Sequence, residues 1–153
     1  MSLHIVLVEP EIPHNTGAIA RSCALTKSTL HLVKPLGFSL EDKYMKRAGL
    51  DYWPLVELQV HEHLDEVFEH LEGHRFFFAT TKTSRRYSDI AYEDGDVLVF
   101  GKETKGLPED LLRAHEDTSI TIPMREDLSR SLNLANACNI ILFEALRQLD
   151  FPF

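Results

Sequence analysis

The stretch that decides the fold stands at the start of the chain, where residues 3–8 read LHIVLV and Glu9-Pro10 follow. A continuous aliphatic run of this kind is typical of a strand buried on both faces of a sheet, and the Glu-Pro pair ends it. Asn15-Thr16-Gly17 then predicts the start of a helix with Asn15 as its N-cap. The chain thus opens with a buried strand followed at once by a helix.

The same alternation continues along the chain. Apolar runs predict further strands at residues 29–33, 56–60, 75–80, 97–100 and 118–122. Helical spacing of apolar residues predicts helices near residues 42–48, 64–71 and 132–149. Strands alternating with helices indicate an α/β fold with a largely parallel sheet flanked by helices. Because no repeat or linker interrupts the sequence, we expect a single domain over residues 1–153.

Composition narrows the class of protein. The chain is 44% hydrophobic and 26% charged, as in ordinary globular proteins. Its apolar runs are too short for a membrane helix, and its start lacks the pattern of a signal peptide, so we expect a cytoplasmic protein. Cys23 and Cys138 lie among apolar residues and are expected to be buried free thiols. The eight histidines lack the spacing of a zinc site, so no metal is expected.

The charge distribution bears on possible nucleic-acid partners. A net charge of −8 argues against a protein that binds nucleic acid over its whole surface, because phosphate contacts require Lys and Arg. Basic residues are nevertheless concentrated at residues 75–87 and 43–47. These two patches are consistent either with local phosphate binding or with solvated charged surfaces.

Three segments that follow predicted strands carry residues that a simple fold does not need. The first is residues 13–17 (PHNTG), with Arg21 two turns into the helix. The second, residues 100–108 (FGKETKGLP), has two glycines that would let a ligand approach the backbone. The third runs from residues 122–124 (IPM) to residues 129–136, where polar side chains begin an apolar helix. Ordinary caps and turns are the alternative explanation of each segment.

The last predicted helix is apolar on two sides. Leu134, Cys138, Leu142 and Leu149 belong to one stripe, and Phe143 lies off it, as do Ile140 and Leu146. Such a helix must bury both sides, either inside its own domain or against a partner. Both alternatives stay open at this point.

Taken together, these segments resemble the three motifs of the SPOUT superfamily of knotted RNA methyltransferases. The resemblance is closest to the tRNA (cytidine/uridine-34)-2′-O-methyltransferase (TrmL-like) family. It rests on residues 9–17 with Arg21, 42–43, 47–52, 100–108, 122–124, 131–134 and 144–148, in this order along essentially the whole chain. Each stretch alone is unspecific, whereas their joint order is specific.

The resemblance implies a SPOUT-like α/β fold in which the C-terminal segment threads a trefoil knot, a rare feature among proteins. It implies methylation, dependent on S-adenosyl-L-methionine, of the ribose 2′-OH at wobble position 34 in a tRNA anticodon stem-loop. It also implies a homodimer formed through the C-terminal helix, in agreement with that helix's two apolar sides. The cofactor-binding residues that it implies are Ala79, Thr80, Gly101, Gly106, Ile122, Met124, Ser131, Leu132 and Asn133.

Arg21 resembles the catalytic arginine of the family. Methyl transfer to a hydroxyl requires the protein to position that hydroxyl and to stabilise the developing alkoxide. Because a guanidinium is a poor base in water, we expect Arg21 to act as an electrostatic clamp, with general-base action as the alternative. Expected substrate contacts, including those to phosphate, come from Asn15, Lys43, Arg47, Arg85 and Arg86.

Two positions depart from the family pattern. Phe143 stands where members carry a tyrosine, so no role is assigned to that hydroxyl, and Ala135 stands where serine is common. Two other functions stay open. One is ribosomal RNA 2′-O-methylation within the same superfamily, whose enzymes often carry an extra domain that this length does not hold. The other is a non-catalytic RNA-binding module on the same fold.

Overall fold

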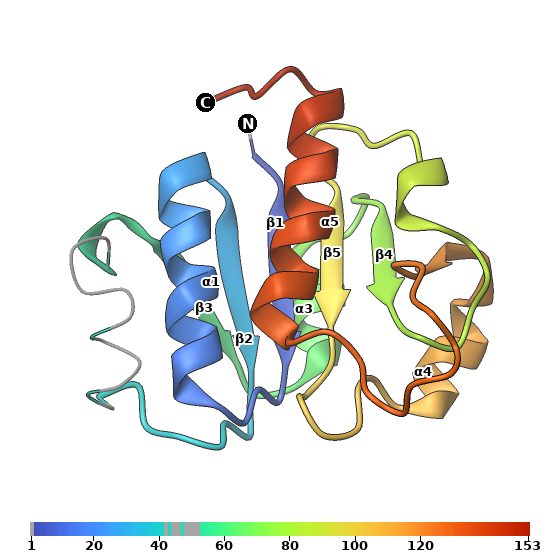
Figure 1. The fold of residues 1–153 in the computed structure, drawn as a ribbon. Helices are drawn as coiled ribbons and strands as arrows, with labels where there is room; N and C mark the ends of the chain where they lie inside the picture. Colours follow the sequence, from blue (N-terminus) through green and yellow to red (C-terminus); the bar gives the residue numbers. More distant parts are fainter. Residues whose placement is uncertain (1, 42, 44–46, 48–52) are drawn as a thin grey trace.

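The computed structural model describes residues 2–41, 43, 47 and 53–153. In this part of the chain, six parallel strands form one sheet in the order β3-β2-β1-β5-β4-β6 (Figure 1). The strands are β1 (His4–Val8), β2 (Thr29–Val33), β3 (Glu57–His61), β4 (Phe76–Ala79), β5 (Val97–Phe100) and β6 (Ser119–Ile120). The α/β fold with a parallel sheet that the alternating pattern predicts is confirmed.

Helices cover both faces of the sheet. They are α1 (Pro13–Thr26), α3 (Leu64–His70), α4 (Glu109–Ala114) and α5 (Leu134–Gln148), with short 3₁₀ turns η1 (Trp53–Leu55), η2 (Tyr87–Asp89) and η3 (Glu116–Thr118). Helices α1 and α5 pack side by side on one face, and α3 lies behind the sheet (Figure 1). The helix expected at residues 42–48 lies outside the described residues, apart from Lys43 and Arg47, which are both exposed.

The two faces of the sheet belong to separate apolar clusters, because successive side chains of a strand point to opposite sides. In β1, Ile5 and Leu7 pack in the cluster that contains α1 and α5 residues, whereas Val6 and Val8 pack in the cluster that contains α3. All residues of β2 and β5 are buried. Burial on both faces explains why these strands have continuous apolar sequences.

The last strand is shorter than predicted. Residues 118–122 were expected to form it, but β6 consists of Ser119–Ile120 alone. The Thr121 backbone bonds to the segment after β4 instead: its N–H donates to the Arg85 carbonyl at 2.8 Å, and its carbonyl accepts from the Tyr87 N–H at 2.9 Å. At this edge of the sheet a loop therefore replaces a regular strand partner.

Both helices on the front face begin at other residues than predicted. Helix α1 starts at Pro13 with Ile12 as its N-cap, so the prediction that Asn15 caps it is wrong. Proline suits the first helical position because its φ is already helical and its missing N–H would have no helical partner. Helix α5 starts at Leu134 rather than at Leu132, and its N-cap is Asn133.

The described residues bear on two further expectations. Cys23 and Cys138 are buried free thiols, as predicted, and burial raises the pKa of Cys23 to about 12. Among the described helices, none combines the length and the apolar character needed to cross a membrane.

Three histidines form a hydrogen-bonded row across β1, β2 and β3. His4 Nδ1 lies 3.0 Å from His31 Nε2, and His31 Nδ1 lies 3.1 Å from His61 Nε2. In each contact one ring nitrogen must donate and the other accept, an arrangement that neutral imidazoles satisfy. Burial, reinforced by the neighbouring histidines, lowers the pKa of His31 to about 3 and that of His4 to about 4.

We expect this row to make the protein less stable in mild acid. The pKa of His31 lies below its ordinary value of 6.5, so at a pH between the two values the unfolded chain binds more protons than the folded chain. The free energy of unfolding therefore decreases as the pH is lowered through this range. For His31 alone, the free energy of unfolding should fall by about 2 kcal/mol between pH 7 and pH 5. Urea unfolding at both pH values measures this loss. The variant His31→Gln should lose about 2 kcal/mol less, and an unchanged loss would contradict the assignment.

Candidate functional site

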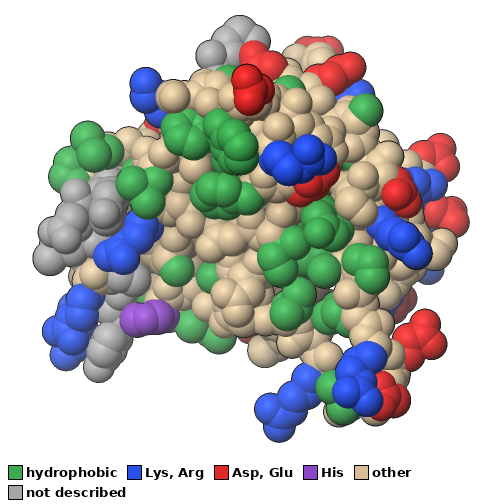
Figure 2. Space-filling view, turned by 45° about the horizontal axis from the view of Figure 1, so that its top comes forward, with side chains coloured by type: hydrophobic (Ala, Val, Ile, Leu, Met, Phe, Trp, Pro, Cys, Tyr) green, Lys and Arg blue, Asp and Glu red, His purple; other side chains and the backbone are tan. Residues whose placement is uncertain are grey.

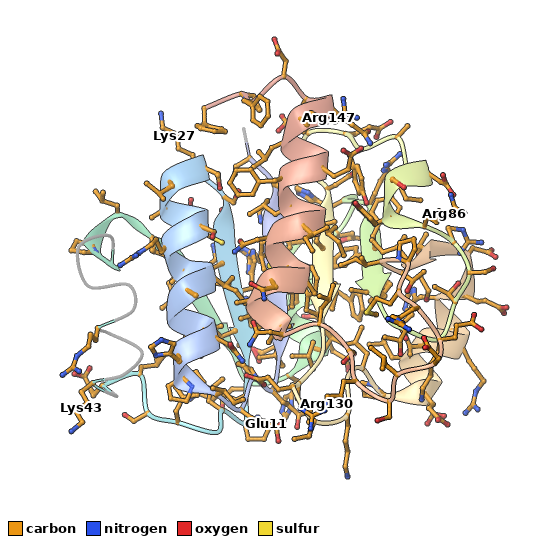
Figure 3. The ribbon with its side chains drawn as sticks, viewed as in Figure 1. Glu11, Lys27, Lys43, Arg86, Arg130 and Arg147 are labelled. Carbon is orange, nitrogen blue, oxygen red and sulfur yellow. The ribbon has the colours of Figure 1, made fainter. Side chains whose placement is uncertain are left out.

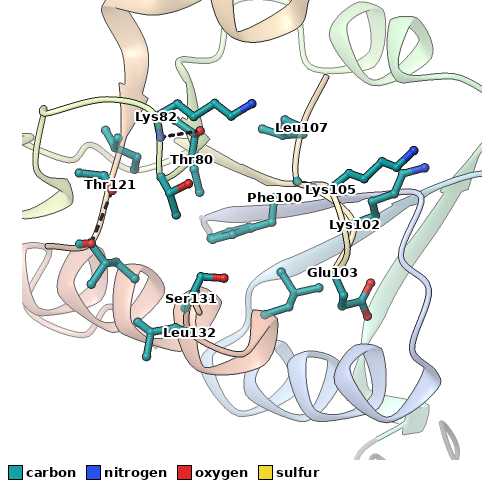
Figure 4. Close-up of a pocket in the computed structure, with 18 of the residues that line it drawn as sticks. Thr80, Lys82, Phe100, Lys102, Glu103, Lys105, Leu107, Thr121, Ser131 and Leu132 are labelled. Carbon is teal, nitrogen blue, oxygen red and sulfur yellow. Dashed lines mark hydrogen bonds between the residues drawn. The ribbon is translucent and has the colours of Figure 1, made fainter. Parts of the chain in front are cut away.

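A cavity of about 260 Å³ lies at the carboxyl ends of β4, β5 and β6 (Figure 4). Three loops form most of its wall: residues 79–82 after β4, residues 100–107 after β5, and residues of the segment between β6 and α5. We call it the main cavity. Parallel α/β sheets bind their ligands beyond the carboxyl ends of the strands, and the main cavity is in this position.

The structure brings most of the expected cofactor-binding residues to the main cavity. Eight of them line it, namely Ala79, Thr80, Gly101, Gly106, Ile122, Met124, Ser131 and Leu132. The ninth, Asn133, does not line it. Its Oδ1 accepts from the N–H groups of Ala135 at 2.9 Å and Asn136 at 3.2 Å, so Asn133 caps α5 and occupies two backbone donors at the start of that helix. The cofactor contacts themselves stay a prediction.

Sequence reasoning missed the helical wall of the main cavity. Leu134, Ala137 and Ile141 line it from α5 at positions i, i+3 and i+7. Their spacing was visible in the sequence, but it did not distinguish a side chain facing a cavity from one facing the core. The helical spacing therefore indicated which residues share a face of α5, but not that this face lines a cavity.

The loop after β5 folds back on itself at two glycines. The Gly106 N–H donates to the Lys102 carbonyl at 2.9 Å, and Gly106 has a φ of 67°. A Cβ added to Gly101 would lie 2.1 Å from the Gly106 carbonyl carbon and 2.3 Å from the Leu107 nitrogen. Gly101 is thus required by the close approach of this loop to itself, rather than by the close approach of a ligand alone.

Three lysines also line the main cavity, and none of them was predicted individually as a site residue. Figure 4 shows Lys82 and, close together, Lys102 and Lys105. Lys82 Nζ lies 3.0 Å from a carboxylate oxygen of Glu109, and Lys102 Nζ lies 3.3 Å from one of Glu9. These ion pairs reduce the net positive charge at this side of the cavity.

Two carboxylates clamp the loop after β5 to the start of α1. Glu103 accepts hydrogen bonds from the Glu11 N–H at 2.8 Å and the Ile12 N–H at 2.9 Å. In return, Glu11 accepts from the N–H of Thr104 at 2.9 Å and from its hydroxyl at 2.8 Å, and these bonds lower the pKa of Glu11. The Glu103 carboxylate thus satisfies the N–H groups of the N-cap residue Ile12 and of Glu11 before it, at the N-terminus of α1.

A chain of side-chain amides extends this clamp to α5. Asn15 Nδ2 donates to Glu103 at 3.2 Å, and Asn133 Nδ2 donates to Asn15 Oδ1 at 3.0 Å. The side chains of Glu103, Asn15 and Asn133 therefore connect the loop after β5, the start of α1 and the start of α5. Asn15 is buried and uses both polar atoms within the chain, which gives it a positioning role. Its expected contact with substrate stays a prediction.

The expected basic residues fall into separate regions of the molecule. Arg21 is exposed on α1 and does not line the main cavity. Arg85 Nη1 donates to the carbonyls of Glu116 at 2.7 Å and Ser119 at 3.1 Å, which anchors its loop, whereas Arg86 is exposed. Figure 3 places Lys43 far from Arg86. The structure thus separates these candidates for substrate contact into distinct regions.

The structure defines the class of this protein as a parallel α/β domain with a cavity beyond the carboxyl ends of its strands. The comparison with known families is more specific: the chain belongs to the SpoU rRNA Methylase family, whose model matches residues 2–143. It is thus an enzyme of a methyltransferase family. The family resemblance drawn from the motifs is confirmed.

Individual relatives are similar over nearly the full chain. A tRNA (cytidine(34)-2′-O)-methyltransferase of Methylovorus glucosotrophus is 53% identical over 148 residues, covering 96% of each chain. A structure described as "Structural insights into the 2-OH methylation of C/U34 on tRNA" has a TM-score of 0.91 at 43% identity over 97% of each chain. An AdoMet-bound rRNA methyltransferase from Sinorhizobium meliloti has a TM-score of 0.84 at 27% identity, over 97% of this chain and 57% of its own.

Proposed function

We propose that this protein transfers the methyl group of S-adenosyl-L-methionine to the ribose 2′-OH of nucleotide 34 in a tRNA. The observation that carries the proposal is the main cavity, where the loops of the second and third motif segments meet beside the loop after β4. The first motif segment is joined to the loop after β5 by the hydrogen bonds of Glu103. The names of the Methylovorus relative and of the structure on C/U34 methylation support the wobble position. The AdoMet-bound relative from Sinorhizobium supports the cofactor.

The lining of the main cavity fits this cofactor chemically. Leu107, Leu132 and Ile122 offer apolar surface to the adenine, and the backbone of the surrounding loops offers donors and acceptors to its edge. Thr80 and Ser131 bring hydroxyls suited to the ribose. When bound, the cofactor supplies an electrophilic methyl group, and the chain supplies position, electrostatics and exclusion of water.

The clamp formed by Glu103, Asn15 and Asn133 holds the elements around this chemistry. It fixes the start of α1, the helix that carries Arg21, against the loop that forms a wall of the main cavity. We assign Arg21 to the stabilisation of the developing alkoxide or of an adjacent phosphate. Since Arg21 lies on the exposed side of α1 rather than in the main cavity, the complete site requires a further element.

A homodimer is the element that we propose. Large apolar side chains are exposed on α1, on α5 and in the C-terminal tail, and we take these three elements as the dimer face. Figure 2 shows hydrophobic groups gathered on the surface that includes it. The exposed side chains are Leu25, Ile140, Phe143, Phe151 and Phe153. Leu25 follows Arg21 by one helical turn, so a dimer formed on this face places Arg21 at the interface. Leu146, in contrast, is buried within its own domain.

We also propose that the C-terminal segment threads a trefoil knot and that the protein is located in the cytoplasm. The segment before α5 lines the main cavity against the loops after β4 and β5, and α5 then packs against α1. This packing is what a threaded C-terminal segment requires. A tRNA substrate and buried free thiols are both in keeping with the cytoplasm.

A methylation assay tests the function directly. The protein is incubated with an unmodified tRNA and with radiolabelled S-adenosyl-L-methionine, and the label is mapped along the RNA. We expect the label on the 2′-oxygen of nucleotide 34, because the proposed acceptor is that hydroxyl. A matched tRNA with a 2′-deoxyribose at position 34 should take up no label. A parallel incubation with ribosomal RNA tests the alternative substrate. Label on ribosomal RNA alone, or label that persists in the deoxy tRNA, would overturn the proposal.

A further inference from the structure

A second hollow adjoins the main cavity. It measures about 550 Å³ and shares Thr81, Thr121, Ile122, Met124 and Ser131 with the main cavity. The rest of its wall comes from two loops, residues 83–86 after β4 and residues 123–130 before α5. We call it the arginine hollow, because its lining includes Arg86, Arg125 and Arg130.

The lining of the arginine hollow is rich in hydrogen-bond donors. One carboxylate, that of Glu126, accompanies its three arginines. Arg125 Nε donates to a carboxylate oxygen of Asp127 at 2.6 Å, and Asp127 does not line the hollow. Arg86 and Arg130 are exposed to solvent. Six hydroxyl side chains complete the polar lining, namely Thr81, Thr83, Ser84, Thr121, Ser129 and Ser131. Guanidinium and hydroxyl groups are the side chains that commonly contact nucleic-acid phosphates.

The loop that carries Arg86 is held in place by its neighbour. The Arg85 guanidinium bonds to the carbonyls of Glu116 and Ser119, and the backbone of residues 85–87 pairs with Thr121. Arg86 therefore extends to solvent from a fixed backbone, which reduces the conformational entropy lost when it binds a ligand. The lining thus carries three arginines and one carboxylate, on a chain whose net charge is −8.

The hollow also offers apolar surface. Met124 is 38% exposed and Leu128 is 59% exposed, and both line it. A wall that combines arginines, hydroxyls and exposed apolar side chains suits single-stranded RNA, whose unstacked bases and phosphates are both accessible. A protein partner would instead require a larger apolar patch with few charges at its centre.

We propose that the arginine hollow binds the RNA backbone next to the nucleotide that is methylated, with Arg130 and Arg86 contacting phosphates. This inference rests on the proposed function and assigns a surface to its substrate. Arg130 directly precedes Ser131, which lines both the hollow and the main cavity. A phosphate held by Arg130 therefore lies beside the site where the acceptor ribose must enter. Arg85, whose guanidinium is used within the chain, makes no such contact.

Binding of an anticodon stem-loop RNA, measured without cofactor at several salt concentrations, tests this inference. The double variant Arg86→Ala/Arg130→Ala should bind the RNA about tenfold more weakly or worse. The slope of log affinity against log salt concentration should be shallower by about 1.4, because two phosphate contacts on a single strand are lost. Arg113→Ala is the matched control, since Arg113 is exposed on α4 and does not line the hollow. Its affinity and slope should match those of the wild type.

The result that overturns the inference is equally defined. If the double variant binds the stem-loop with wild-type affinity and slope, the arginine hollow does not hold phosphate. The pair Arg86→Lys/Arg130→Lys keeps the charge and should retain most of the salt slope. Because binding is measured without methyl transfer, a wild-type protein that binds the RNA through these arginines but does not methylate it would contradict the proposed function alone.

Discussion

Replacement of Arg21 by alanine is expected to lower the rate of 2′-O-methylation by about 100- to 1,000-fold, the usual effect of removing one group that stabilises a developing oxyanion. The affinity for S-adenosylhomocysteine should stay unchanged, because Arg21 does not line the main cavity. The fold should also persist, since Arg21 is exposed in the middle of α1 and alanine is the best helix former. A single-turnover assay with tRNA measures the rate, and calorimetry measures the affinity.

Charge and geometry at Arg21 can be separated by a second substitution. Arg21→Lys keeps the positive charge but loses the planar fork that binds two oxygens at once. We therefore expect its rate to lie between those of the alanine variant and the wild type. If Arg21→Ala methylates tRNA at the wild-type rate, Arg21 is not the catalytic arginine. If it loses affinity for S-adenosylhomocysteine as well, its role lies in the cofactor site rather than in catalysis.

The sheet was predictable because its central strands are buried on both faces. Strands β1, β2 and β5 leave long apolar runs in the sequence, and their bounds agree closely with the prediction. Strand β6 was predicted too long because, at the edge of the sheet, Thr121 pairs with a loop through its backbone. Backbone pairing of this kind leaves no trace in side-chain periodicity, so the sequence pattern could not indicate where the strand stops.

The positions around the site were less predictable from the residues themselves. The loops of Gly101 and Ser131 had ordinary structural explanations, and only their joint order with Arg21 indicated a site. The amide of Asn15 bonds to Glu103, 88 residues away, and to Asn133, 118 residues away. A helix cap seemed the simplest role for Asn15 because sequence rules describe caps from neighbouring residues. In the structure the N-cap is Ile12, whose N–H donates to Glu103 of a distant loop.

Arg85 and Arg86 illustrate the same limit for charged residues. They are identical and adjacent in sequence, and both were expected to contact substrate. Arg85 is bonded to two backbone carbonyls, whereas Arg86 is exposed and lines the arginine hollow. Adjacent side chains in extended backbone point to opposite sides, so one faces the protein and the other solvent. The packing of the loop against β6 decides which of the two side chains faces inward. The sequence around Arg85 and Arg86 does not indicate this packing.

Replacement of Gly101 by alanine is expected to lower the affinity for S-adenosylhomocysteine by about 100-fold. The new Cβ would lie 2.1 Å from the carbonyl carbon of Gly106 and 2.3 Å from the nitrogen of Leu107. Both are backbone atoms, so no side-chain rotation relieves the overlap, and the loop of residues 101–107 must move. That loop is a wall of the main cavity. Overpacking of this kind costs about 1–3 kcal/mol, which can correspond to a 100-fold loss of affinity.

The control for this substitution is Gly73, a glycine with positive φ that does not line the main cavity. Gly73 has a φ of 90° and nothing within 4 Å of an added Cβ. Gly73→Ala should therefore lower stability by about 1–3 kcal/mol through backbone strain while keeping wild-type affinity for S-adenosylhomocysteine. Because β5 ends at Phe100, before Gly101, the sheet should survive in both variants, and circular dichroism checks that it does. Wild-type affinity in Gly101→Ala would show that the loop after β5 does not shape the cofactor site.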